Sequence, residues 1–255
     1  MVRPQVGDTI GHARVETLIA SSGFSDVYRA TDLRSGKPCA VRLWHVPFDY
    51  VTELRALFQH DARIAAALRH PHILRISEFG EWHSYGFITS EYMATGSLPM
   101  WLRRVSAPPV ALFDLLRQAA LALAYAHRFN IAHGDLRPAA LLLTPDARYR
   151  AGQRLAISGF ALGRLSSEAL AIGGITPNRY LAPERRAGAE PSLAADIFAF
   201  GRLVGDLFGD TAIDPHITDL MAACCALNPA RRPPAAALAL ALALHVRALS
   251  KDSAH

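Results

Sequence analysis

The segment from Ile131 to Thr144 constrains the fold and chemistry of this chain more than any other stretch. Its sequence, I-A-H-G-D-L-R-P-A-A-L-L-L-T, places a carboxylate (Asp135) after a histidine (His133) and two residues before a cation (Arg137). Such a carboxylate can accept the proton of a hydroxyl group while the cation neutralises charge that develops on a transferred group. The simpler alternative is a loop aspartate that caps backbone amides.

The composition predicts a folded protein. Of the 255 residues, 51% are hydrophobic and 19% are charged, which is enough apolar material for a large buried core. The formal net charge is +5, and the arginines are scattered along the sequence rather than grouped. Scattered arginines are typical of a solvated surface, so we expect no nucleic-acid partner.

Three further features of the sequence indicate the cellular compartment of the protein. The cysteines, Cys39, Cys224 and Cys225, make no disulfide framework, which favours a reducing environment. The N-terminal residues contain no apolar segment of the kind found in signal peptides. The longest apolar run, residues 233–249, is shorter than the ~20 residues that a membrane span needs, so it predicts a buried helix. We expect a cytoplasmic location without a membrane span, which includes the cytosolic part of a membrane-associated assembly.

Hydrophobic patterning changes along the chain. The first third alternates between apolar and polar residues, which predicts strands, and one helix is expected over residues 50–68. A strongly apolar helix is expected from Val110 to His127, directly before the Ile131 segment. The predicted strands cover residues 9–18, 27–30, 39–44 and 85–92, with a turn-rich patch at residues 20–26.

The segment around Asp135 resembles the catalytic loop of protein kinases, H-R-D-L-K-P-x-N in the serine/threonine branch. Three downstream segments keep the order and spacing of that family, so the resemblance covers nearly the whole chain. They are Tyr180–Glu184 for Y-x-A-P-E, Asp196–Gly201 for D-x-x-x-x-G, and Asn228–Pro233 for N-P-x-x-R-P.

This resemblance implies a bacterial Hanks-type kinase domain with an α+β fold in two lobes. Residues 1–93 would form a small β-rich N-lobe with one main helix, and residues 94–255 a larger, mostly helical C-lobe. The resemblance also implies that Glu184 pairs with Arg232, and that Asp196 holds the backbone of the loop around His133. Phe160 takes the aromatic position of the D-F-G motif.

The nucleotide-binding positions of the family are only partly retained. Residues 20–28 resemble the glycine-rich loop G-x-G-x-F-G-x-V-Y, but Ala20, Ser22 and Ser25 replace the three glycines and Gly23 lies between them. Each added side chain hinders the approach of phosphate to backbone N-H groups, so an ordinary hairpin is an equally good interpretation. The residues expected to contact an adenine are Val27, Ala40 and Leu142.

Arg42 stands where the family has its phosphate-binding lysine, and Asp61 stands where the family has the glutamate that pairs with that lysine. Arginine is longer than lysine and aspartate is shorter than glutamate, so the pair can persist with its lengths exchanged. The alternative is that Asp61 faces solvent.

The metal-binding positions are lost. Ala140 replaces the catalytic-loop asparagine, and Gly159 replaces the aspartate of D-F-G. Magnesium requires oxygen ligands, and neither side chain has one. We therefore expect no metal site and no required cofactor, with at most binding of ATP or ADP without magnesium.

The segment that would carry regulation also departs from the family. Gly134 replaces the arginine before the catalytic aspartate, which removes the usual partner of a phosphorylated activation segment. One extra residue also separates Thr176-Pro177 from Tyr180.

The selective loss of chemistry leads to the hypothesis of a pseudokinase, a kinase-like module that acts by binding a protein partner, with Asp135 and Arg137 as remnants of the catalytic site. The first alternative is a divergent, weakly active serine/threonine kinase, because Asp135 is retained. The second is a small-molecule phosphotransferase, because H-G-D-L also opens the equivalent loop of the aminoglycoside kinases.

Overall fold

The computed structural model describes residues 3–48, 52–163, 179–209 and 214–252. The chain divides into two compact units. Within the described residues, the first unit contains the chain up to Arg69 together with Leu74–Met93. The second unit contains His70–Ile73, Ala94–Gly163 and the chain from Arg179 onward.

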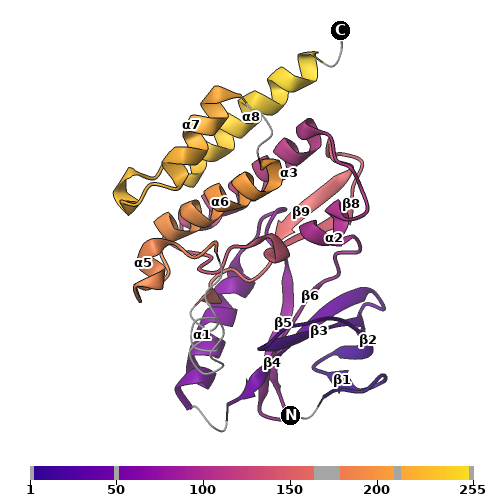
Figure 1. The fold of residues 1–255 in the computed structure, drawn as a ribbon. Helices are drawn as coiled ribbons and strands as arrows, with labels where there is room; N and C mark the ends of the chain where they lie inside the picture. The colour runs from indigo at the N-terminus through magenta and orange to yellow at the C-terminus, as the bar shows by residue number, and fades with distance from the viewer. Residues whose placement is uncertain (1–2, 49–51, 164–178, 210–213, 253–255) are drawn as a thin grey trace. The chain divides into compact units, whose positions relative to one another are not determined.

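The first unit is an antiparallel sheet with one long helix (Figure 1). Its six strands lie in the order β1-β2-β3-β4-β6-β5, and the helix α1 contacts β5 and β6. The elements are β1 (Thr9–Ile10), β2 (Ala13–Ser21), β3 (Ser25–Asp32), β4 (Pro38–Pro47), α1 (Thr52–Ala67), β5 (Ile76–Trp82) and β6 (Tyr85–Glu91).

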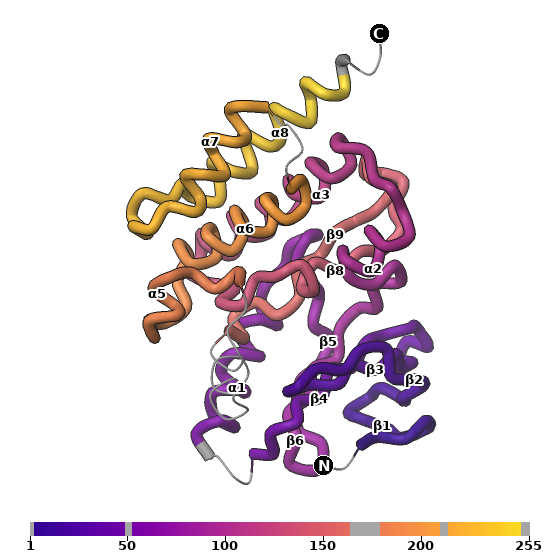
Figure 2. Tube along the Cα trace, in the orientation of Figure 1, coloured from indigo at the N-terminus to yellow at the C-terminus, as the bar shows by residue number. Residues whose placement is uncertain are grey.

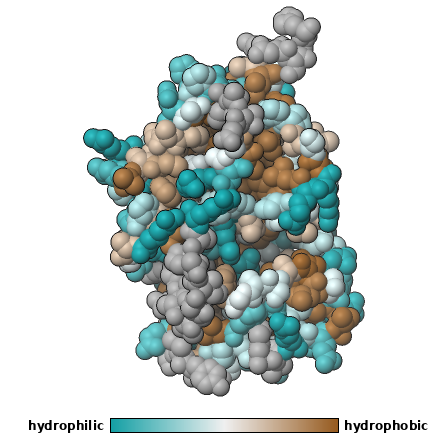
Figure 3. All heavy atoms as spheres, viewed as in Figure 1, coloured by the Kyte–Doolittle hydropathy of each residue, from teal (hydrophilic) through white to brown (hydrophobic). Residues whose placement is uncertain are grey.

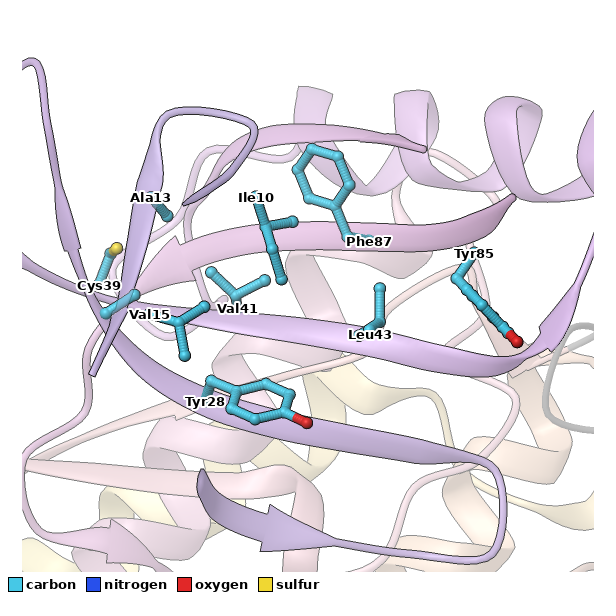
Figure 4. Packing of buried hydrophobic residues seen from close by; sticks show 10 residues of the cluster. Ile10, Ala13, Val15, Tyr28, Cys39, Val41, Leu43, Tyr85 and Phe87 are labelled. Carbon is cyan, nitrogen blue, oxygen red and sulfur yellow. The ribbon is translucent and has the colours of Figure 1, made fainter. Parts of the chain in front are cut away.

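Alternation along the strands gives this sheet its buried core. Tyr28 pairs with Val41 and Ala30 pairs with Cys39 across β3 and β4, and all four side chains are buried in one cluster. Figure 4 shows side chains of this cluster, contributed by β1, β2, β3, β4 and β6, gathered together. Residues of opposite parity therefore lie on the other face of the sheet.

Aromatic rings fasten α1 to the sheet. The ring of Phe58 lies 5.3 Å from the ring of Trp44 and 5.3 Å from that of Phe48, both on or next to β4. Gly86 on β6 allows this approach, because a Cβ atom there would lie 2.6 Å from the Phe48 ring. The packing explains why the apolar positions of α1 recur at helical spacing.

The second unit is mostly helical, with a three-stranded sheet in the order β7-β8-β9 (Figure 2). The apolar helix α3 packs against α8 and β9, and the pair β8-β9 carries the chain from the Ile131 segment to Gly159. The elements are β7 (Gly96–Ser97), α2 (Leu98–Leu102), α3 (Pro109–His127), η1 (Pro138–Ala140), β8 (Leu141–Pro145), β9 (Gln153–Ile157), α5 (Pro183–Arg186), α6 (Leu193–Phe208), α7 (Pro215–Cys224), η2 (Pro229–Arg231) and α8 (Ala235–Asp252).

By length and composition, α3 is the one helix of the described residues that could cross a membrane. Its most apolar window is 67% buried inside the protein. The core helix of a folded domain shows the same combination, and we interpret α3 in this way.

On the face of the molecule seen in Figure 3, hydrophilic residues cover much of the surface, with hydrophobic residues between them.

The structure corrects several details of the sequence analysis. The turn between β2 and β3 is shorter than the predicted patch, because β2 extends to Ser21 and β3 begins at Ser25. Strand β5 was not predicted, since its residues are partly exposed at most positions and show no clear alternation. The apolar run that forms α8 is buried on one face only, with Leu240 and Leu244 62% and 57% exposed.

Gly201 lies where α6 packs closely against the C-terminal end of α7. A Cβ atom at this position would lie 2.7 Å from Cβ of Cys224 and 2.8 Å from Sγ of Cys225. The glycine of the D-x-x-x-x-G motif therefore allows two helices to pack in contact.

We expect Gly201→Ala to lower the free energy of unfolding by about 1–3 kcal/mol, because the new methyl group overpacks this contact. Gly205→Ala on the same helix is the matched control, since a Cβ atom there has no neighbour within 4 Å. Alanine should raise stability there by up to about 1 kcal/mol through its helix propensity. Urea unfolding of both variants would measure the difference, and equal effects would contradict the packing explanation.

Candidate functional site

The backbone of the Ile131 segment is fixed by one buried carboxylate. Asp196, at the start of α6, is 1% exposed and accepts hydrogen bonds from the backbone N-H groups of His133 (2.7 Å) and Gly134 (2.9 Å). His127 Nε2 lies 3.0 Å from the same carboxylate. Residues more than 60 positions apart in the sequence are thereby joined at the centre of the second unit.

The imidazole of His133 orders the loop from inside. The backbone N-H of Asp135 donates to Nδ1 (3.1 Å), so we assign the proton to Nε2, which lies 2.8 Å from the carbonyl oxygen of Ser158. Burial lowers the pKa of His133, outweighing the raising effect of Asp196, so the ring is neutral at neutral pH. The ring also contacts Phe160 edge to face at 5.0 Å.

Asp135 remains accessible at the tip of this loop. Its side chain is 19% exposed, and Nε of Arg137 lies 3.3 Å from its Oδ2 atom. Asp135 also borders a small hollow, partly open to solvent, whose other lining includes Tyr180, Ala182 and Arg185. The structure therefore brings together the carboxylate and the cation that the sequence singled out.

Glu184 and Arg232 form the ion pair expected from the sequence. Nη1 and Nη2 of Arg232 donate to the two carboxylate oxygens of Glu184 at 2.5 and 2.9 Å. The Arg232 side chain is fully buried, and its other donors reach the carbonyl oxygens of Ala194 and Ala226. Its guanidinium also lies over the Phe198 ring at 5.1 Å. These bonds hold α5 against the start of α6.

The two positions that lack metal ligands lie close together in the second unit. Leu141 pairs with Ile157 across β8 and β9, which brings Ala140 next to the end of β9. The carbonyl oxygen of Ala140 accepts both the backbone N-H of Ser158 (2.9 Å) and its hydroxyl (3.2 Å). The Ser158 hydroxyl is therefore bonded to the protein backbone. The next residue, Gly159, has a positive φ of 89°.

Gly134 is in backbone contact with another glycine. It has φ 81°, and a Cβ atom there would lie 2.9 Å from Cα of Gly163 and 3.0 Å from Cβ of Pro191. A Cβ atom on Gly163 would lie 2.5 Å from Cα of Gly134. No side chain fits at either position without displacement of the other segment. The motif resemblance pointed to a missing arginine at Gly134 but not to this contact.

In the first unit, a hydrogen-bonded hairpin stands in place of a glycine-rich loop. The backbone N-H of Ser22 donates to the carbonyl oxygen of Ser25 (2.9 Å), and the N-H of Ser25 donates to the Ser22 hydroxyl (3.1 Å). Two backbone donors near Gly23 are thus engaged within the turn itself. The choice between an ordinary hairpin and a phosphate cradle stays a prediction.

Asp26 is a buried carboxylate that the sequence analysis did not identify. It is 0% exposed and accepts from the Ser21 hydroxyl (2.6 Å), with His45 Nε2 at 3.2 Å and Arg3 Nε at 3.3 Å. Burial raises the pKa of Asp26, but the hydrogen bond from Ser21 and the charges of His45 and Arg3 outweigh it, so the pKa is lowered. Asp26 lies two residues before the inward-facing Tyr28 on β3, so strand alternation could have indicated from the sequence that its side chain is buried.

The remaining residues that the sequence analysis predicted are divided between the two units. In the first unit, Val27 pairs with Arg42, and Ala40 lies on the same face of the sheet, opposite the buried core. Asp61 is 1% exposed, so the interpretation that it faces solvent is wrong. The pairing of Asp61 with Arg42 stays a prediction. Leu142 lies on β8 in the second unit, and the adenine contact assigned to it, Val27 and Ala40 stays a prediction as well.

Comparison with known proteins identifies the family. Residues 14–213 match the model of the protein kinase domain. The chain belongs to the protein kinase family. The segment between Gly163 and Arg179, which contains the extra residue predicted after Thr176-Pro177, lies outside the described residues of this kinase domain.

Similar proteins are bacterial serine/threonine kinases. The chain is 31% identical over 244 residues to the serine/threonine-protein kinase PknD of Mycobacterium tuberculosis, covering 91% of this chain and 36% of that protein. It is 30% identical over 200 residues to the serine/threonine-protein kinase pkn2 of Myxococcus xanthus, covering 76% of this chain and 24% of that protein. The chain therefore spans less than half the length of these curated relatives.

A solved structure shows the same fold. The crystal structure of the Mycobacterium tuberculosis PknI kinase domain superimposes with a TM-score of 0.71 at 24% identity, covering 94% of this chain and 98% of that chain. The predicted α+β kinase fold, with a β-rich and a helical part, is thus confirmed.

Replacement of Glu184 by glutamine should lower the free energy of unfolding by about 3–5 kcal/mol, because the buried guanidinium of Arg232 loses its counter-ion. The hydrogen bonds from Arg232 lower the pKa of Glu184, so its stabilisation is complete above the unfolded pKa of about 4.3 and is lost as the pH falls through the lower folded value. Urea unfolding from pH 3 to pH 8, beside the exposed control Glu190→Gln, would test this. A pH-independent difference would contradict it.

Replacement of Gly134 by alanine should destabilise the domain more than replacement of Gly188. Both glycines have positive φ, at 81° and 92°, so both variants lose about 1 kcal/mol from backbone strain. Only Gly134 has neighbours, and its contact with Gly163 should add about 1–3 kcal/mol. Thermal and urea unfolding of the two variants would measure the excess, and equal losses would show that the segments separate at little cost.

Proposed function

We propose that this domain is a pseudokinase, a kinase-fold module that binds a protein partner and does not transfer phosphate. The observation that carries the proposal is the side chain present at the two metal-binding positions of the family. Ala140 and Gly159 supply a methyl group and a hydrogen where magnesium needs oxygen ligands. The proposal includes a cytoplasmic location for the domain.

The chemistry of phosphoryl transfer explains why the residues at these two positions carry the proposal. In active kinases, metal ions bridge the phosphates and neutralise the charge that develops in the transition state. The residues here do not fit a magnesium ion, since Ala140 presents only a carbonyl already bonded to Ser158. Among the described residues, no group of three or more His, Cys, Asp or Glu side chains is placed to serve as a substitute.

The intact parts of the domain support a binding role. Two backbone N-H groups of the loop around His133 are hydrogen-bonded to Asp196, and the ion pair of Glu184 with Arg232 is formed. These contacts stabilise the shape of the second unit without contributing to catalysis. A chain that retains its shape and loses its metal ligands is suited to presenting a surface to another protein.

Nucleotide binding, where it occurs, is proposed to be weak and independent of metal. The hairpin hydrogen bonds between Ser22 and Ser25 engage backbone donors that a phosphate would need. Arg42 remains as a cation on the face of the sheet that carries Val27. A cation without a metal ion attracts phosphate but does not arrange it for transfer.

The second candidate function is a weakly active serine/threonine kinase. Asp135 is retained beside Arg137, and the similar proteins are serine/threonine kinases by name. This candidate needs a metal ligand from outside the two family positions. The small-molecule phosphotransferase is less well supported, because the domain has the A-P-E glutamate pair and the D-x-x-x-x-G helix of protein kinases.

A thermal-shift comparison with ATP or ADP, in magnesium and in chelator, would test the proposal. We expect no stabilisation, or the same stabilisation in both conditions, since the domain has no magnesium ligands at the family positions. Phosphate transfer from labelled ATP to the domain or to a general protein substrate should stay at background. Asp135→Asn is the control, and it should change neither the shift nor the background.

A shift that requires magnesium, together with phosphate transfer that Asp135→Asn abolishes, would overturn the proposal in favour of the weakly active kinase. Transfer to an aminoglycoside or another small hydroxyl compound, and not to protein, would favour the phosphotransferase.

A further inference from the structure

A continuous string of rings lies on the second unit and includes none of the residues assigned to the site. Phe129, Tyr125, His70, His72 and Tyr149 follow one another with centroid separations of 5.2, 5.0, 5.4 and 5.4 Å. Tyr125 lies on α3 and Phe129 just after its end, His70 and His72 lie in the segment before β5, and Tyr149 lies in the loop between β8 and β9. Phe129 is 57% exposed, and Tyr125, His70 and Tyr149 are partly exposed.

The imidazole rings of His70 and His72 are uncharged at neutral pH and contribute to the string as aromatic rings. Burial lowers the pKa of His72 to about 4, and burial also lowers the pKa of His70. His72 Nδ1 lies 2.9 Å from the carbonyl oxygen of Leu155, which fixes the orientation of the ring. At neutral pH the string is therefore uncharged, with an exposed aromatic end at Phe129, and His72, which is 4% exposed, links His70 to Tyr149 from beneath the surface.

Arginines surround the string. Nη1 of Arg154 donates to the carbonyl oxygen of Pro71 (2.7 Å), between the two histidines in sequence. Arg117 lies on α3, and Arg128 caps its C-terminus on the same side of the helix, because eleven residues make about three helical turns. Five arginines lie beside the string in space or in sequence, and two of them are paired with aspartates, Arg117 with Asp114 and Arg148 with Asp146, so positive charge is in excess. The five are Arg117, Arg128, Arg148, Arg150 and Arg154.

We propose that this arginine-rimmed ring surface docks an acidic peptide segment of a partner protein, with an aromatic side chain of the peptide stacked on Phe129 and Tyr125. The excess positive charge selects carboxylates, and the exposed ring supplies an anchor. The inference rests on the proposed function, because it names the chemistry of the partner that such a module binds.

An acidic peptide fits the surface better than a nucleic acid does. The arginines come from separate segments around the rings, and two of them already hold aspartates, so the excess charge is small and dispersed. Non-specific binding of nucleic acid depends on neutralising a row of phosphates along a basic stripe. Separate carboxylates flanking one aromatic residue match dispersed arginines and a single exposed ring.

The test is fluorescence anisotropy with a short labelled peptide in which glutamates flank a tryptophan. We expect the 255-residue chain to bind it and added salt to weaken binding. Arg128→Gln with Arg150→Gln should weaken binding by about three- to tenfold, since each exposed pair contributes modestly. Phe129→Ala should weaken it by about threefold or more through loss of stacking.

Matched control variants lie elsewhere on the same unit. Arg231→Gln with Arg247→Gln removes two exposed arginines, and Leu240→Ala removes a side chain that is 62% exposed, against 57% for Phe129. These variants should bind the peptide as the original chain does. A peptide with glutamine in place of glutamate should bind at least about tenfold more weakly. Thermal unfolding of each variant confirms that the fold is retained.

The proposal is overturned if the chain does not bind the peptide at concentrations up to about 1 mM. It is also overturned if the control variants lose as much affinity for the peptide as the variants of the ring surface. It also fails when the glutamine peptide binds equally well, or when a single-stranded oligonucleotide binds more tightly with the same dependence on Arg128, Arg150 and Phe129. Failure of the proposed function would look different: magnesium-dependent phosphate transfer with intact peptide docking would leave this surface as the docking site of an active kinase.

Discussion

The buried carboxylate of Asp196 is the interaction on which the rest of the second unit depends. A charged group with 1% exposure is tolerated only when its oxygens are fully engaged, and here two backbone N-H groups and one imidazole engage them. The loop that presents Asp135 owes its shape to this carboxylate together with the imidazole of its own His133. The imidazole of His133 then extends the same network to the end of β9.

This arrangement separates shape from chemistry. The bonds that hold the loop involve Asp196, His133 and Ser158, and none of them involves a side chain at the two positions where a kinase would bind metal, since Ala140 takes part only through its backbone carbonyl oxygen. The side chains of Ala140 and Gly159 therefore contribute no hydrogen bond to the loop. The same separation explains why Asp135 is still held in place beside Arg137: the loop geometry keeps it there whether or not it is used.

The sequence predicted the parts of the fold that depend on motif and periodicity. The ion pair of Glu184 with Arg232 could be expected because both residues lie in recognisable motifs, and the α3 helix because its apolar residues are dense and regular. Contacts made by single residues between distant segments could not be foreseen. Asp26 meets His45 and Arg3 only after three segments fold together, and the ring string joins α3 to the segments around His70 and Tyr149. Strand β5 lacks alternation, so pairing with β6 defines it, and no local pattern could reveal it.

The contact between Gly134 and Gly163 makes the two positions interdependent. A side chain introduced at the first position requires the second segment to move away, and a side chain at the second requires the first to yield. Neither single substitution fits in place, since each new side chain meets the backbone of the other segment. A residue larger than glycine at either position therefore needs coordinated changes in two segments that are nearly 30 residues apart.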